Sequence, residues 1–213
     1  MKRSGMALWL ALVLAASGAQ AGDELAQRLV TQGNDRGAAA CASCHGANGE
    51  GMAAAGFPTL AGQNAAYLKK QLADYRSGRR DNPIMQPVAA ALSDDEVAAL
   101  AAYFARQTPP PAAAASLPPE REKKAHKLAV AGDWNRNLPA CFACHGPNGA
   151  GIAPNFPVIT GQNAPYIEAQ LNAWKAGLRK NDPNALMKVV AERMSADEIR
   201  DLAAWLAAFK PAQ

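Results

Sequence analysis

Two five-residue stretches, CASCH at residues 41–45 and CFACH at residues 141–145, decide how this chain folds. Together they contain all four cysteines of the chain. The pattern C-x-x-C-H is typical of covalent attachment of a c-type haem, in which each thiol bonds one vinyl group. The histidine that follows is expected to ligate the iron. We therefore predict two covalently bound haem c groups, attached and ligated by two sets of residues: Cys41, Cys44 and His45, and Cys141, Cys144 and His145.

Three other uses of paired cysteines fit the chain less well. A zinc site built from two C-x-x-C pairs usually separates them by about 15–20 residues, far fewer than here. A thioredoxin-like redox motif is expected near a β-α-β pattern, and no segment near either pair alternates like a strand. Disulfides are compatible with an exported protein, but they do not require a histidine after each pair.

The first residues of the chain have the pattern of a secretory signal peptide. Lys2 and Arg3 precede an apolar stretch over residues 6–16, and AQA at residues 19–21 is a small-x-small cleavage site. The apolar stretch is shorter than the roughly 20 residues of a membrane span, and a retained anchor is the alternative. We predict cleavage before Gly22 and a periplasmic location, because haem c is attached outside the cytoplasm. Peripheral membrane association of the mature chain is compatible with these residues.

The rest of the chain is an internal duplication. GQN at residues 62–64 has its counterpart at residues 161–163, and a similar glycine-rich turn follows each haem motif. A segment rich in proline and alanine separates the repeats, a composition that favours an extended, semi-rigid linker. We predict four segments: a signal peptide over residues 1–21, a first domain over 22–107, a linker over 108–119 and a second domain over 120–213.

Each repeat has the pattern of helices joined by turns. Apolar residues recur at helical spacing in three segments of each repeat. Ser93 and Ser195 each stand three residues before a glutamate, which is the capping-box pattern of a helix start. Asn64 and Asn163 are expected to cap the middle helices. No segment alternates convincingly like a strand, so we predict an all-α fold of two tandem domains.

The sixth ligand of each iron must be found outside the haem motifs. The chain has only three histidines, and His126 lies in a lysine-rich segment where a surface position is expected. Methionine is the usual alternative and raises the reduction potential. Met85 and Met187 each stand eight residues before a capping serine and follow an Asn/Asp-Pro pair, so we predict that they are the ligands. Met52 and Met194 have no equivalent methionine in the other repeat and are expected to pack.

The residues around the irons allow two interpretations each. The carbonyls of Pro58 and Pro157 could accept the hydrogen bond that a ligating histidine usually donates, but an ordinary loop proline explains them equally well. Arg79, Arg80 and Arg179 could pair with haem propionates, although a solvated side chain is the expectation for any one of them. Four aromatic residues are candidates either for lining the haem crevices or for ordinary packing: Tyr67, Tyr75, Tyr166 and Trp174.

The charge of the chain argues against a nucleic-acid partner. The formal net charge of +4 falls to +2 without Lys2 and Arg3. Residues 22–110 contain 8 basic against 9 acidic residues, and residues 111–213 contain 12 against 9. Four haem propionates would make the whole protein more acidic, so we expect no nucleic-acid binding. The difference between the halves could give them different docking partners.

With these motifs the chain resembles a class I cytochrome c written twice, and in particular the dihaem cytochrome c4 family. The resemblance rests on the haem motifs, FPTLAGQ at residues 57–63, YLKKQL at 67–72, Met85 and LSD at 92–94, with their second-repeat counterparts. It implies two cytochrome c folds related by a pseudo-twofold axis, with haem edges facing each other. It also implies a periplasmic electron carrier whose donor is a membrane quinol-oxidising complex or a dehydrogenase, and whose acceptor is often a terminal oxidase.

We therefore expect outer-sphere electron transfer and no enzymatic activity, with both axial ligands of each iron kept throughout. One alternative is the electron-accepting subunit of a flavoprotein dehydrogenase. Another is a dihaem peroxidase or a sulfur-oxidising cytochrome, which would need an open coordination position. The two predicted His/Met pairs leave no such position at rest.

Overall fold

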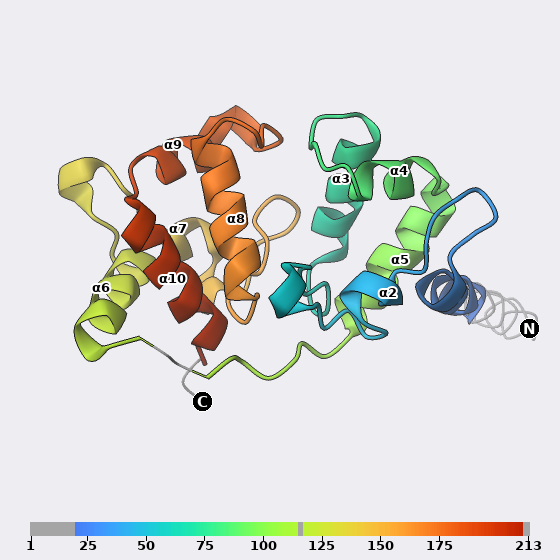
Figure 1. Cartoon of the computed structure of the whole chain (residues 1–213), viewed down its shortest axis with the longest axis horizontal. Coiled ribbons are helices and arrows are strands. Elements are labelled where there is room, and N and C mark those ends of the chain that lie inside the picture. Colours follow the sequence, from blue (N-terminus) through green and yellow to red (C-terminus); the bar gives the residue numbers. More distant parts are fainter. Residues whose placement is uncertain (1–19, 115–116, 211–213) are drawn as a thin grey trace, which may run out of the picture.

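The structure is a computed structural model that describes residues 20–114 and 117–210, and it consists of two groups of helices side by side (Figure 1). Residues 1–19 of the predicted signal peptide lie outside the described part. The first group contains a helix over residues 20–32, α2 (Ala42–His45), η1 (Ala53–Ala55), α3 (Ala65–Arg76), α4 (Met85–Ala90) and α5 (Asp94–Arg106). The second contains α6 (Pro119–Val130), η2 (Trp134–Arg136), α7 (Cys141–His145), η3 (Pro147–Gly149), α8 (Ala164–Lys175), η4 (Pro183–Ala185), α9 (Leu186–Glu192) and α10 (Ala196–Ala208).

Helices are the only regular structure in the described residues, where extended pairing is limited to three isolated β-bridges. The all-α prediction is therefore confirmed. None of the helices within residues 20–114 and 117–210 is long and apolar enough to cross a bilayer. The short helices α4 and α9, which the sequence pattern does not reveal, begin at or beside the predicted ligands Met85 and Met187.

The middle and last helices of each half begin where their capping residues predict. The Asn64 side chain accepts a hydrogen bond from the Tyr67 backbone N–H (2.6 Å), and Asn163 accepts one from the Tyr166 N–H (2.9 Å). Each bond satisfies one of the free N–H groups at a helix start. Both predicted capping boxes also form: Ser93 with Glu96, and Ser195 with Glu198.

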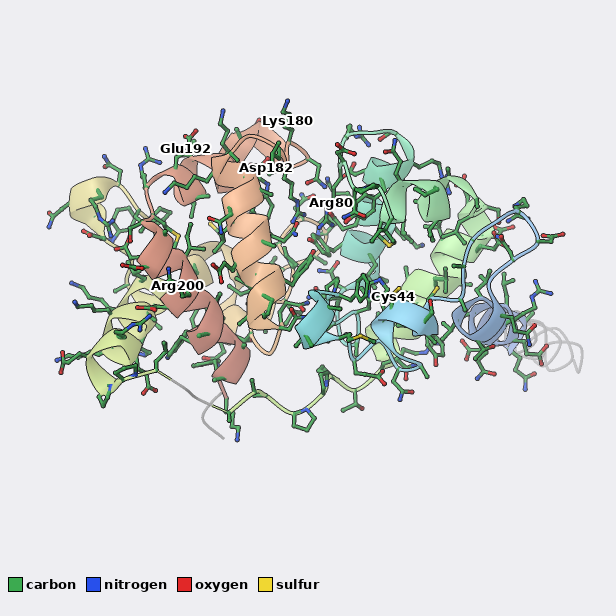
Figure 2. The ribbon with its side chains drawn as sticks, in the orientation of Figure 1. Cys44, Arg80, Lys180, Asp182, Glu192 and Arg200 are labelled. Carbon is green, nitrogen blue, oxygen red and sulfur yellow. The ribbon has the colours of Figure 1, made fainter. Side chains whose placement is uncertain are left out.

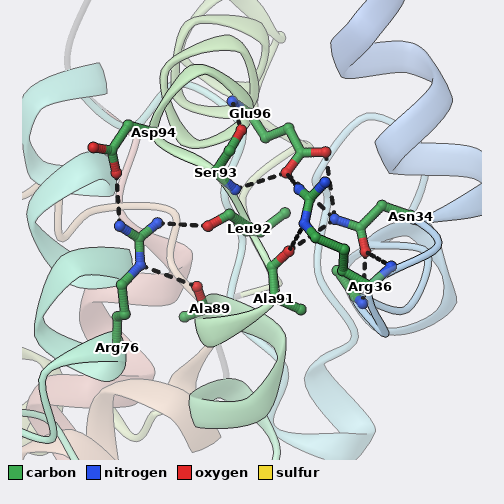
Figure 3. Close-up of polar contacts among 10 residues, drawn as sticks. Asn34, Arg36, Arg76, Ala89, Ala91, Leu92, Ser93, Asp94 and Glu96 are labelled. Carbon is green, nitrogen blue, oxygen red and sulfur yellow. Dashed lines mark hydrogen bonds and ion pairs between the residues drawn. The ribbon is translucent and has the colours of Figure 1, made fainter.

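The capping box of α5 also ties together three segments of the first half (Figure 3). The Glu96 carboxylate accepts from its own cap and from Arg36, which lies in the loop after the first helix. Arg76, at the end of α3, donates to the Leu92 carbonyl (2.8 Å) and pairs with Asp94 (2.6 Å). These bonds hold the segment that carries α4 against α3 and so help to place Met85.

Each half has its own hydrophobic core. In the first half, the buried cluster joins the N-terminal helix, α3 and α5, and its larger members are Leu29, Val30, Leu68, Leu92, Val97, Leu100 and Phe104. In the second half, the matching helices contribute Leu128, Ile167, Leu171, Trp174, Met194, Ile199, Leu202, Trp205 and Leu206. Because the two clusters are separate, apolar burial stabilises each half independently, and other contacts must join the halves.

Candidate haem sites

Both C-x-x-C-H motifs fold as single helical turns, α2 and α7. Residues three apart share one side of a helix, and the motif cysteines and histidines of both turns line one cavity of about 1020 Å³. Burial raises the pKa of the Cys41 and Cys141 thiols to about 11. Thiolate redox sites have a lowered thiol pKa instead, so the thioredoxin-like alternative is not supported.

Each motif histidine is held by the carbonyl of a proline. His45 Nδ1 lies 3.0 Å from the Pro58 oxygen, and His145 Nδ1 lies 2.9 Å from the Pro157 oxygen. A carbonyl can only accept, so Nδ1 carries the proton and Nε2 keeps a free lone pair for a metal. Burial also lowers the pKa of both imidazoles, which favours the neutral form that ligates iron. Of the two interpretations of these prolines, the structure confirms the one in which their carbonyls accept this bond.

A glycine in each half allows the proline loop to approach the motif this closely. The N–H of Gly51 donates to the His45 carbonyl (2.8 Å), and Gly151 does the same for His145 (2.7 Å). Both glycines have positive φ, +78° and +81°. A Cβ on Gly51 would lie 2.7 Å from the Thr59 backbone nitrogen. Only glycine therefore serves at this position.

Met85 and Met187 line the same cavity as the two histidines. The backbone N–H of each is fixed by the residue before the preceding proline. Asn82 Oδ1 accepts from Met85 at 2.9 Å, and Asp182 Oδ2 accepts from Met187 at 2.9 Å. The Asn/Asp-Pro pair thus acts as the cap of the segment that carries each methionine. The structure brings the predicted ligands together, and their bonds to iron stay a prediction.

The other candidate ligands have different surroundings. His126 is exposed on α6, as expected, and its ring lies edge-on to Trp205 with 5.5 Å between centroids. Met194 is buried in the second core, as predicted. Met52 was expected to pack but is 45% exposed, and its backbone pairs with Phe57 at the surface. The four aromatic candidates all line the cavity: Tyr67, Tyr75, Tyr166 and Trp174. Trp174 also belongs to the second core, so it has both predicted roles.

Two arginines, Arg80 and Arg179, are buried, so the expectation of solvated side chains is wrong for them. Figure 2 shows Arg80 between the two halves. Arg80 is 5% exposed and donates to Gln71 of its own half and to Tyr166 and Gln170 of the other, each at 2.8 Å. Arg179 is 6% exposed and donates to the same two glutamines at 3.1 and 2.7 Å. The two guanidinium groups lower the pKa of Tyr166, against the effect of its burial.

A second pair of glutamines, Gln63 and Gln162, also bonds across the interface. Gln63 accepts from the Val158 N–H (3.1 Å) and donates to the Val158 carbonyl (2.7 Å). Gln162 makes the same two bonds to Thr59, at 2.9 and 2.8 Å. Val158 and Thr59 each directly follow the proline that holds a motif histidine. Each half therefore braces the histidine loop of the other.

The family of the chain follows from its relatives. A cytochrome c family profile matches residues 30–108 and 135–210. The crystal structure of reduced recombinant cytochrome c4 from Pseudomonas stutzeri is 31% identical with a TM-score of 0.77, covering 90% of this chain and 98% of that one. The chain belongs to the dihaem cytochrome c4-like family. It is therefore a tandem cytochrome c with two covalently bound haem c groups, as predicted, and it transfers electrons.

Two further relatives of this cytochrome have names that include a dehydrogenase. The thiosulfate dehydrogenase electron acceptor of Stutzerimonas stutzeri (strain A1501) is 52% identical over 199 residues, covering 93% of this chain and 91% of the relative. The thiosulfate dehydrogenase (TsdBA) from Marichromatium purpuratum, in its as-isolated form, is 44% identical with a TM-score of 0.79. That match covers 86% of this cytochrome but only 39% of the longer chain.

The cavity walls suit the two haem groups chemically. A buried charge is normally paired, yet within the described residues neither Arg80 nor Arg179 forms an ion pair with a carboxylate. The indole N–H of Trp174, which also lines the cavity, is buried without a hydrogen-bond partner. A haem propionate would give the two guanidinium groups a charge partner and the Trp174 indole an acceptor.

Proposed function

We propose that this cytochrome accepts electrons from a thiosulfate dehydrogenase in the periplasm and passes them to a further redox protein. The observation that carries the proposal is the 52% identity to a thiosulfate dehydrogenase electron acceptor over nearly the whole length of both chains. The longer relative supports it, because a dehydrogenase chain there contains a region similar to this cytochrome. The dehydrogenase alternative is thus favoured, with thiosulfate as substrate, and the names of these relatives say nothing of a flavin.

The residues of the two sites suit this role. Haem iron supplies a one-electron Fe(III)/Fe(II) couple. We propose that His45 and Met85 hold one iron, and that His145 and Met187 hold the other. The carbonyl bonds at Nδ1 orient both imidazoles, and a thioether sulfur stabilises the reduced state. Two closed sites in one cavity provide storage for two electrons without binding the substrate itself.

One protein is a candidate for accepting electrons from this cytochrome. Delivery to a terminal oxidase was the main expectation, and the names of the dehydrogenase-related proteins do not support it. The likeness to a cytochrome c4 over nearly the whole length of both chains favours a mobile carrier that leaves its donor. We therefore propose, second, that this carrier passes its electrons to a terminal oxidase. None of the relatives named above supports a membrane quinol-oxidising complex as the electron donor.

The test is reduction of the purified dihaem protein by thiosulfate in the presence and absence of a thiosulfate dehydrogenase. We expect rapid reduction of both haems, followed by their absorption bands, only when enzyme and substrate are both present. An enzyme that reduces an artificial acceptor but leaves this protein oxidised would overturn the proposal. N-terminal sequencing of the periplasmic fraction tests the location, with Gly22 as the expected first residue.

The enzyme alternative is tested with external ligands. A peroxidase or other catalytic haem needs an open or easily opened position. We expect neither carbon monoxide with the reduced protein nor cyanide with the oxidised protein to bind readily at either haem without denaturant. Rapid binding at one haem would favour the enzyme alternative for that site.

A further inference from the structure

The repeat loses its symmetry at one place in the interface. Helix α3 carries Lys70 and Asp74, whereas the equivalent positions of α8 are Ala169 and Ala173. The second half also has one more residue between its buried arginine and its capping Asp-Pro pair. Asp81 alone fills that interval in the first half, and Lys180 with Asn181 fills it in the second.

These asymmetric residues contact one another across the interface. Asn181 donates from Nδ2 to Asp74 Oδ2 at 2.8 Å and to Gln71 Oε1 at 3.0 Å. Lys70 donates to the Asn181 carbonyl at 2.9 Å and pairs with Asp74. Asp74 is 1% exposed, and Asn181 is also buried. Burying a carboxylate costs folding free energy unless its oxygens accept hydrogen bonds. Asn181 donates one of the hydrogen bonds that Asp74 accepts.

The contact leads directly to the predicted ligand Met187. Asn181 precedes Asp182, whose carboxylate accepts from the backbone N–H groups of Met187 and Lys188 at 2.9 and 3.1 Å. Figure 2 shows Lys180 and Asp182, the neighbours of Asn181, on the side of the second half that faces the first. The chain of bonds therefore runs from α3 of one half to the sixth-ligand segment of the other.

The first half has no equivalent dependence in the described residues. Asn82 caps its own segment by accepting from the Ile84 and Met85 N–H groups at 3.0 and 2.9 Å. Residues 81–84 make no side-chain hydrogen bond to the second half within residues 20–114 and 117–210. Both halves have a buried arginine that bonds across the interface, but among the described residues only the Met187 segment has the additional crossing bonds of Asn181.

We propose that Asp74, assisted by Lys70, is a positioning residue for the second haem: it holds Asn181 and thereby keeps Met187 facing His145. The inference rests on the ligation by Met187 proposed above. It gives the second methionine ligand a tie to the other half that the first methionine ligand lacks. A methionine ligand raises the potential of a haem, so any loosening of Met187 lowers only the second potential.

The test restores the symmetry of the repeat. Asp74→Ala and Lys70→Ala introduce the residues that α8 carries at these positions. The two upfield-shifted methionine methyl resonances of the reduced holoprotein report each Met–Fe bond, and Met85→His and Met187→His variants assign them. In Asp74→Ala we expect loss or broadening of the Met187 resonance and a lower second potential, with the Met85 resonance and the first potential unchanged. Lys70→Ala should have the same effect to a smaller extent.

Two variants separate positioning from loss of charge or of folding. Asp74→Asn keeps an oxygen that can accept from Asn181, so it should restore most of the Met187 resonance. Arg79→Leu introduces the counterpart Leu178 and removes a pairing partner of Asp74 (3.0 Å) that does not contact Asn181; both resonances should stay. If Asp74→Ala does not fold, Asn181→Ala removes the bond to Asp74 together with those to Gln71 and Arg179, and it should affect the Met187 resonance alone.

Three outcomes would overturn the proposal. Both resonances unchanged in Asp74→Ala would show that Asp74 positions nothing at the second haem. Equal changes at both haems would show a general effect on the interface. A wild-type protein without a Met187 resonance would remove the ligation itself, and this result is distinct because it does not involve Asp74. The electron-acceptor function is tested separately by enzymatic reduction, and it can survive each of these outcomes.

Discussion

The two halves of this cytochrome hold their iron-binding residues alike but present different side chains elsewhere. The histidine-to-proline distances agree within 0.1 Å. The capping boxes repeat, and so do Gly51 and Gly151 beside the histidines. By contrast, Leu178 is 73% exposed where the first half has Arg79, and Ala173 stands where the first half buries Asp74. The proline and glycine that place the motif histidines are the same in both halves, whereas single surface and interface positions, such as Arg79 and Asp74, differ. Two similar sites thereby acquire different surroundings.

The largest expected difference comes from exchanging one methionine at a time. Met85→His and Met187→His should each lower the potential of their own haem by a sizeable part of the roughly 0.8 V over which axial ligands set haem potentials. The cause is loss of a thioether that favours the reduced iron. Potentiometric titration followed optically measures both potentials. A variant in which neither potential changes would show that its methionine is not a ligand.

Truncation of one core should reveal how independent the halves are. Leu29 is fully buried in the first core, and Leu128 is its counterpart in the second. Leu29→Ala should destabilise the first half by about 2–5 kcal/mol, the usual cost of a Leu-to-Ala cavity. Guanidinium denaturation of the holoprotein, followed by circular dichroism, should then show an earlier first transition. Leu128→Ala is the matched control, and a single transition in both variants would mean that the halves unfold as one unit.

The buried arginines test the interface itself. Arg80→Ala should cost about 1.5–3 kcal/mol, as is usual for hydrogen bonds to charged groups, and Arg179→Ala should cost a similar amount. Both arginines donate to Gln71 and Gln170. The double variant should therefore deviate from additivity, because neighbours with shared partners couple by about 0.5–3 kcal/mol. Additive unfolding free energies would show that the two arginines act separately.

The smallest expected effect concerns the capping glutamates in acid. The hydrogen bond from Arg136 lowers the pKa of Glu198 most strongly. A carboxyl with a lowered folded pKa stabilises above its unfolded pKa and loses that contribution as the pH falls through the folded value. Glu198→Gln should thus be less stable than wild type at neutral pH, by under about 1 kcal/mol for so exposed a pair. The difference in melting temperature should shrink as the pH falls below the ordinary glutamate pKa of about 4.3 and vanish below the lowered folded value; persistence there would indicate a packing effect instead.

Glu96 provides the comparison in the first half. Burial raises the pKa of Glu96, but the interactions with Ser93, Asn34 and Arg36 lower it by more, so the net shift is again downward. Glu96→Gln should follow the same pH dependence. A pH dependence present in only one half would show that the two capping boxes, alike in their bonds, differ in their electrostatics.

Local features of the chain were predictable because their physics is local. The haem motifs, the asparagine caps and the capping boxes each depend on residues within a few positions of one another. The repeat added a second copy that made each pattern more specific. Pro58 and Pro157 could be proposed as histidine partners only as one of two alternatives, because a loop proline has many uses.

The interface could not be predicted, because a polar helix face does not reveal whether it meets water or another domain. Gln71 lies among the apolar positions Leu68, Leu72 and Tyr75, and Gln170 repeats this arrangement. A glutamine kept on the apolar side of both middle helices was the available indication of a buried polar contact. The role of Asn181 had no such indication, because it depends on Asp74, more than one hundred residues away.

The reciprocal glutamine bonds have a consequence for the oligomeric state of any isolated half. Gln63 and Gln162 each satisfy both backbone groups of a residue in the opposite half. A half released from its neighbour would present that backbone and its own glutamine to solvent, in a self-complementary arrangement. Since these bonds are reciprocal, a second copy of the same half would offer equivalent partners, and pairing of two isolated halves would satisfy the exposed groups.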